Sequence, residues 1–119
     1  MKLTEAEWSV MEILWSGERF SLGEIAAPLH NRNNWSKNTV HTYLTRMEAK
    51  GLVSIDHAQS KPYSAVITRD DVARQERNQL LNKVYGGAAG DLIAAFLKES
   101  PISSQEAARL RQLLNDMEV

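Results

Sequence analysis

The chain has 119 residues, of which 43% are hydrophobic and 24% charged, and its net charge is −1. This length and balance describe one small globular domain, or one domain with a short extension, and they exclude disordered and membrane-embedded proteins. Cysteine is absent, which excludes disulfides and thiolate metal sites and fits a cytoplasmic protein. No apolar run approaches the roughly 20 residues of a membrane span, and no secretory signal is visible, so we expect no membrane insertion.

Two capping boxes, Thr or Ser followed three residues later by Glu, begin the predicted helices 4–16 and 21–30. Pro28 lies inside the second of these and should bend or shorten its last turn. The segment 30–34 is polar, and we expect it to be a loop.

A third helix is predicted from Ser36, a good N-cap, to Lys50, and Gly51 is suited to the left-handed position that closes a helix. Its apolar residues recur at helical spacing: Val40, Tyr43, Leu44 and Met47. Its other side carries short polar and cationic residues, and no acidic residue occurs in 28–47. Two helices joined by a short polar turn, the second with such a face, predict a helix-turn-helix.

Amides and hydroxyls can contact base edges in the major groove, and Lys or Arg can contact guanine or phosphate. We expect Asn38, Thr42 and Arg46 to contact bases or adjacent phosphates. The full set of expected DNA contacts is Arg32, Ser36, Lys37, Asn38, Thr39, His41, Thr42, Thr45, Arg46 and Lys61, with Lys37, Thr39, Lys61 and Arg32 directed at phosphate. The alternatives are an ordinary solvated helix face, a surface role for Lys61, and a structural pairing of Arg46 with Glu48 or a neighbour.

After Gly51 apolar residues recur at every second position, as in a β-strand, and no longer at helical spacing. Val53 and Ile55 follow this pattern in a first segment, and residues 63–67 follow it in a second. The connection 57–61 is polar, so we predict a β-hairpin with Pro62 at an edge or strand start. A hairpin directly after a recognition helix is the wing of a winged helix.

The remaining residues predict three helices. Asp70 or Asp71 should cap the first, which runs to about Tyr85 before a pair of glycines. The second covers 91–98, and a third capping box at 103–106 starts the last. So short a segment cannot bury its apolar faces within itself, which favours a symmetric dimer; packing onto the winged helix is the alternative. The expected dimerisation residues are Leu80, Leu81, Val84, Tyr85, Leu92, Ile93, Phe96, Leu110, Leu114 and Met117.

The predicted fold is therefore mainly α with a small β-hairpin wing. Residues 1–69 would form a winged-helix DNA-binding domain, and residues 70–119 a helical dimerisation domain.

Three groups of residues resemble the penicillinase and methicillin-resistance repressor family. The first-helix match is Glu7-Trp8, Val10-Met11, Ile13 and Trp15. The recognition-helix match is Trp35-Ser36, Thr39-Val40, Thr42, Thr45-Arg46 and Lys50-Gly51. The C-terminal match is Asn82-Lys83-Val84-Tyr85, Leu92-Ile93 and Phe96. The resemblance implies a homodimeric repressor that occupies a palindromic operator on double-stranded DNA.

The resemblance also implies release from DNA through a membrane sensor-protease pathway that cuts the dimerisation region, at a bond matching Ala95–Phe96. Cleaved family members have Asn where this chain has Ala95. Lys37 and Asn38 stand where the family usually has Pro and Lys, so the operator sequence should differ. The copper-responsive branch of the same fold carries a cysteine cluster that this chain lacks.

Three other functions are less well supported by the sequence. A catalytic triad is not indicated, because the three histidines lie in the DNA-facing half without suitable spacing, so no catalytic residue, metal site or cofactor is expected. A metal-responsive repressor using those histidines with Asp56 is one alternative. A winged helix that binds protein and not DNA is the other.

Overall fold

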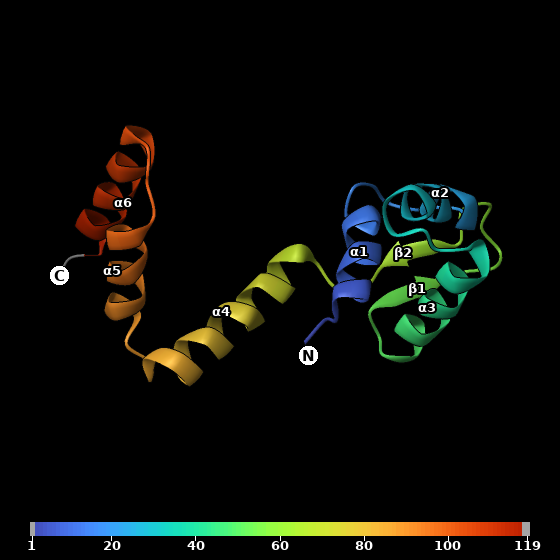
Figure 1. The fold of residues 1–119 in the computed structure, drawn as a ribbon, viewed down its shortest axis with the longest axis horizontal. Helices are drawn as coiled ribbons and strands as arrows, with labels where there is room; N and C mark the ends of the chain where they lie inside the picture. Colours follow the sequence, from blue (N-terminus) through green and yellow to red (C-terminus); the bar gives the residue numbers. More distant parts are fainter. Residues whose placement is uncertain (1, 118–119) are drawn as a thin grey trace. The chain divides into compact units, whose positions relative to one another are not determined.

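The computed structural model describes residues 2–117, and over this range the chain is mainly helical with one small antiparallel sheet (Figure 1). The elements are α1 (Glu5–Leu14), α2 (Leu22–Asn33), α3 (Lys37–Ala49), β1 (Val53–Ile55), β2 (Tyr63–Ala65), α4 (Arg69–Tyr85), α5 (Ala89–Glu99) and α6 (Ser104–Asp116). The chain divides into two compact units between Arg77 and Asn78. This order of helices and strands confirms the predicted winged-helix fold class.

Local sequence explains where α1 and α2 begin. Thr4 and Ser21 are their N-caps, and each accepts a hydrogen bond from the backbone N–H of the glutamate three residues on. The carboxylate of each glutamate in turn accepts the backbone N–H of the cap residue, so the two predicted capping boxes are confirmed.

The predicted end of α2 was wrong. The helix continues past Pro28 to Asn33, so the expected polar loop at 30–34 is mostly helical. Asn34 stops it by taking a left-handed conformation, with φ of 57°, and its N–H donates to the carbonyl of His30 at 3.1 Å. Pro28 removes one backbone donor only, and the burial of Leu29 just after it favours helix over loop. The turn to α3 is consequently reduced to residues 34–36.

The hydrophobic core lies between the first three helices and the hairpin. Its largest fully buried side chains are Met11, Leu14, Ile25, Leu29, Leu44, Met47, Leu52, Val10, Val40, Val53 and Val72. Trp35, at the turn before α3, stacks on the Tyr43 ring with centroids 4.8 Å apart. Burial of so many aliphatic side chains, each contributing about 1.5–3 kcal/mol relative to exposure, makes this unit the stable part of the fold.

The hairpin pairs Val53 with Ala65 and Ile55 with Tyr63. The sequence did not reveal a further bridge between Phe20 and Tyr63, whose backbones exchange hydrogen bonds of 2.8 and 3.0 Å. This bridge joins the hairpin to the α1–α2 connection. The base of the wing is therefore held by the body of the unit.

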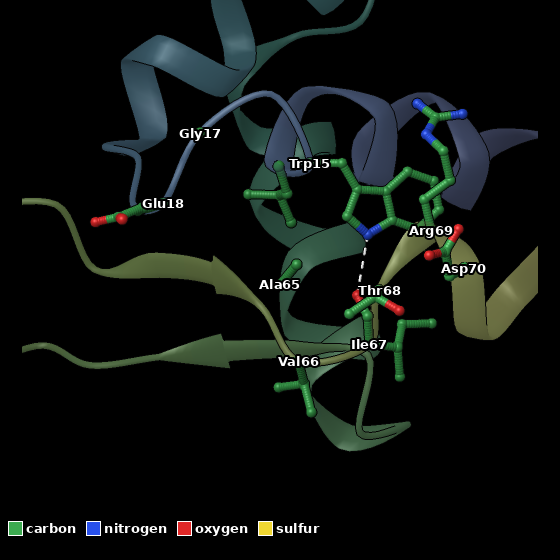
Figure 2. Close-up of a pocket in the computed structure, with 10 residues that line it drawn as sticks. Trp15, Gly17, Glu18, Ala65, Val66, Ile67, Thr68, Arg69 and Asp70 are labelled. Atoms are coloured by element: carbon green, nitrogen blue, oxygen red, sulfur yellow. Dashed lines mark hydrogen bonds between the residues drawn. The ribbon is translucent and has the colours of Figure 1, made fainter.

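The start of α4 is fixed against α1. Thr68, and not Asp70 or Asp71 as expected, is the residue that receives the capping bond: its Oγ1 accepts the N–H of Asp71, and Asp71 accepts the N–H of Thr68. Figure 2 shows the adjoining hollow, where the Trp15 indole N–H donates to the Ile67 carbonyl at 2.9 Å. The guanidinium of Arg69 lies 4.8 Å from the Trp15 ring centroid, within cation–π range.

The second unit contains the end of α4 together with α5 and α6. Gly86 and Gly87, both at positive φ, end α4, and the predicted capping box at Ser103 is confirmed. Within residues 78–117 no apolar side chain is buried. Over the described range, no helix has both the length and the apolar character needed to span a membrane.

Candidate nucleic-acid interface

The buried stripe of α3 determines which of its side chains face outward. Val40, Leu44 and Met47 are fully buried, while Ser36 caps the helix by accepting the N–H of Thr39 at 3.1 Å. The polar side of α3 is exposed and carries Asn38, His41, Thr42, Thr45 and Arg46. We call these five residues the α3 outer face.

Two threonines of the α3 outer face have a fixed hydrogen-bonding role. Thr42 Oγ1 donates to the carbonyl of Asn38, and Thr45 Oγ1 donates to the carbonyl of His41, both at 3.0 Å. Each hydroxyl proton is thus used inside the helix, and each oxygen remains available as an acceptor. Such acceptors, with the threonine methyl groups, match the amino groups and thymine methyl groups of the major groove.

Asn38 and Arg46 keep their side-chain hydrogen-bonding groups free within the part of the chain that the structure describes. The alternative pairing of Arg46 with Glu48 is not observed there. A free amide and a free guanidinium are the groups that bind adenine and guanine in a bidentate manner.

The expected phosphate contacts differ in their surroundings. Lys37 is exposed at the first turn of α3, and Thr39 is half-buried with its hydroxyl 3.0 Å from Ser36 Oγ. Arg32 instead lies on the last turn of α2 and lines a hollow with Glu12 and other residues of α1. Lys37 lines a different hollow together with residues of α2, so the two cations border different hollows.

Lys50, the C-cap of α3, is joined to α1 by an ion pair. Its ammonium lies 2.7 Å from Glu7 Oε2, and the Glu7 side chain is only 5% exposed. Burial acts to raise the pKa of Glu7, but the hydrogen bonds from Lys50 and Thr4 outweigh it and bring that pKa below its ordinary value. This pair fixes the C-terminal end of α3 on the body of the unit.

Lys61, at the end of the wing loop, is joined to α2. Its ammonium lies 3.1 Å from Glu24 Oε2, and its carbonyl accepts a 2.8 Å hydrogen bond from Arg19. Arg19 also donates to the carbonyl of Pro62 at 3.0 Å. The hydrogen bond from the Ser21 backbone, and then that from Lys61, lowers the pKa of Glu24, so its carboxylate is charged at neutral pH.

Sequence reasoning missed the roles of Glu7, Glu24 and Arg19 in placing these elements. The capping-box pattern identified both glutamates, but only as residues that begin their own helices. Their lysine partners lie 43 and 37 residues away in the sequence, beyond the reach of any local pattern.

The expected dimerisation residues remain uncovered in the single chain. Leu81, Tyr85 and Leu92 are half-buried. The others are exposed: Leu80, Val84, Ile93, Phe96, Leu110, Leu114 and Met117. The bond matching the family's cleavage site, Ala95–Phe96, lies inside α5.

The fold and the α3 outer face define the class of this protein: a winged helix-turn-helix protein with a helical C-terminal extension. Over the described residues, no three His, Cys, Asp or Glu side chains are grouped so as to hold a metal ion.

The chain belongs to the penicillinase repressor family, whose sequence pattern matches residues 3–116. It is similar to the penicillinase repressor of Staphylococcus aureus, with 30% identity over 98% of this chain and 94% of that protein. The methicillin resistance regulatory protein MecI of Mammaliicoccus sciuri is 29% identical over 96% of this chain and 94% of its own length. The penicillinase repressor of Bacillus licheniformis is 26% identical over 97% and 91%. The predicted family is thus confirmed, and it is a family of transcriptional repressors and not of enzymes.

Proposed function

We propose that this repressor acts as a homodimer that binds a palindromic operator, with α3 of each chain in the major groove and the wing against the flanking backbone. The observation that carries the proposal is the α3 outer face. It holds amide, hydroxyl and guanidinium groups, and it is turned outward by three fully buried residues behind it. Its exposed Asn38 and Arg46 have the chemistry of direct base readout.

The charge of α3 and its surroundings supports this proposal more than the net charge of −1 does. No acidic residue occurs in the sequence from Pro28 to Met47, so the α3 outer face carries no charge of the same sign as phosphate; Glu48, in the last turn of α3, is the exposed acidic residue of this helix. Local charge, and not the total, determines attraction to DNA.

The exposed apolar side chains of α5 and α6 support the homodimer. Helices with so much exposed Leu, Ile and Phe are stabilised by a second apolar surface, and a second copy of the same segment supplies one through two-fold symmetry. Two-fold symmetry then requires half-sites separated by one helical turn of DNA, roughly 34–36 Å, or a multiple of it.

Selection of bound sites from a random DNA pool tests the proposal. We expect enriched sequences with a dyad repeat, bound by two chains, and an affinity that falls steeply between about 50 and 200 mM salt. Failure to enrich any site, together with no binding at low salt, would contradict the proposal and favour a winged helix that binds protein.

Arg46→Ala tests the reading role of α3 on the selected operator. We expect it to weaken binding by about 1–3 kcal/mol and to relax specificity at one position of each half-site. Arg77→Ala, which removes an exposed arginine from α4, is the matched control and should leave specificity unchanged. An equal loss on all DNA sequences would assign Arg46 to phosphate.

A further inference from the structure

Two capping-box glutamates of the winged-helix unit each bind two partners. Glu7 Oε1 accepts the backbone N–H of Thr4 at 2.9 Å, and its Oε2 accepts the ammonium of Lys50 at 2.7 Å. Glu24 repeats the arrangement: Oε1 accepts the N–H of Ser21 at 2.9 Å, and Oε2 accepts Lys61 at 3.1 Å. In each case the lysine belongs to an element that the proposed function places on DNA.

The two pairs differ in their access to solvent. Lys50 is 47% exposed but the Glu7 side chain is only 5% exposed, so loss of Lys50 to an external anion would leave a nearly buried carboxylate without its cation. In the other pair, Lys61 and Glu24 are 54% and 43% exposed. An exposed pair of this kind contributes little to stability, and a phosphate can reach its ammonium.

The side chain of Lys61 is able to leave Glu24 without disturbing either element. The wing backbone is held by Arg19, which donates to the carbonyls of Lys61 and Pro62, and by the bridge from Phe20 to Tyr63. Glu24 is held by its own bond to the Ser21 backbone. The pair therefore connects two parts that are already fixed, and only the ammonium needs to move.

We propose that Glu24 is an intramolecular substitute for a DNA phosphate: it holds the Lys61 ammonium in the free protein and gives it up to the DNA backbone on binding. This inference rests on the proposed function, since it requires the wing to lie on DNA. Binding then exchanges one ionic interaction for another, so Glu24 lowers the affinity for DNA of every sequence. Glu24 is thus a residue that sets affinity, although it makes no contact with DNA itself.

Glu24→Gln separates the two roles of the side chain. Glutamine is accepted at this position of a capping box, so α2 keeps its cap while the ion pair with Lys61 is removed. We expect the variant to bind the selected operator about two- to fivefold more tightly, because the ammonium no longer has to leave a carboxylate.

Glu106→Gln is the matched control. Glu106 is also a capping-box glutamate, at the start of α6, and it forms no ion pair over the part of the chain that the structure describes. The same chemical change there should leave DNA affinity unaltered.

Lys61→Gln distinguishes two explanations of tighter binding by Glu24→Gln. One is transfer of the Lys61 ammonium from Glu24 to a DNA phosphate, and the other is direct repulsion of DNA by the Glu24 carboxylate. We expect this variant to bind more weakly, with the slope of log affinity against log salt reduced by about 0.9 for each phosphate that is no longer neutralised. In the double variant with Glu24→Gln, the gain from Glu24→Gln should disappear, because it requires Lys61. Thermal unfolding of all variants should confirm that they are folded.

Each other outcome overturns the inference. A gain that persists without Lys61 would show a general repulsion by Glu24, and unchanged or weaker binding by Glu24→Gln would show a pair that only supports the wing. If the unaltered protein binds no DNA, the proposed function fails together with this inference. If it binds and Glu24→Gln behaves as the unaltered protein does, only the exchange fails.

Discussion

The two units of the chain bury their apolar side chains to very different degrees. In the first unit, aliphatic residues of α1, α2, α3 and the hairpin are fully buried. In residues 78–117, Ile93, Phe96, Leu113 and Leu114 are about half exposed, although α5 and α6 carry as clear an amphipathic pattern as any helix of the first unit. An amphipathic pattern alone therefore does not say whether the chain itself supplies the covering surface.

The difference indicates that the two units depend on different interactions. The first unit encloses its own core and can present α3 as a rigid surface. The second unit leaves its apolar faces for another molecule, which in the proposed function is a second copy. Its stability should then depend on protein concentration, whereas that of the first unit should not.

Leu44→Ala should have the largest effect on the first unit. The side chain is fully buried behind the α3 outer face, and removing it should lower the free energy of unfolding by about 2–5 kcal/mol. Urea denaturation at two protein concentrations measures this, with the same decrease expected at both.

Leu114→Ala in α6 is the counterpart, since Leu114 is 56% exposed in the single chain. Its effect on the free energy of unfolding should be largest at high protein concentration and should shrink as the protein is diluted to monomers, because stabilisation by a partner falls with its concentration. An equal effect of both variants at every concentration would contradict the inference that only the second unit depends on a partner for its stability.

Leu110→Asp should break the proposed pairing of the second units. A charge placed on that apolar face in both chains should weaken dimerisation by about 2 kcal/mol or more, close to the loss of an interface hot spot. Sedimentation equilibrium measures it, with Gln105→Asp on the exposed first turn of α6 as the control. A monomeric unaltered protein would refute the homodimer and leave the exposed faces without the partner proposed for them.

Glu7→Gln should have a smaller effect, confined to the first unit. The variant keeps the cap of α1 but loses the charged bond to Lys50, which should reduce stability at pH 7 by about 1–2 kcal/mol. Since the pKa of Glu7 is lowered on folding, its contribution is complete above about pH 4.5 and is lost as the pH falls through the folded-state pKa.

The acid side of the stability profile should therefore be flatter in Glu7→Gln than in the unaltered protein. Thermal unfolding followed from pH 7 to pH 3 measures this, with Glu106→Gln as the control. Parallel profiles for Glu7→Gln and the unaltered protein would show that the Glu7–Lys50 pair contributes nothing.

Much of the candidate site could be predicted from sequence because α3 is defined by local signals. Ser36 caps it, Gly51 closes it at a φ of 80°, and the spacing of its apolar residues determines which side is buried. The end of α2 could not be predicted, because the packing of Leu29 outweighed a local preference for loop in a segment containing proline and asparagine.

The sequence by itself determined the types and order of the elements, their caps and their apolar faces, since each depends on residues at most a few positions apart. Only the tertiary structure decided which residues those apolar faces pack against and which partners the charged side chains bind. The pairs Glu7–Lys50 and Glu24–Lys61 and the bridge from Phe20 to Tyr63 join residues 37 or more positions apart. No periodicity encodes such distances, because chain folding, and not helix or strand geometry, brings these groups together.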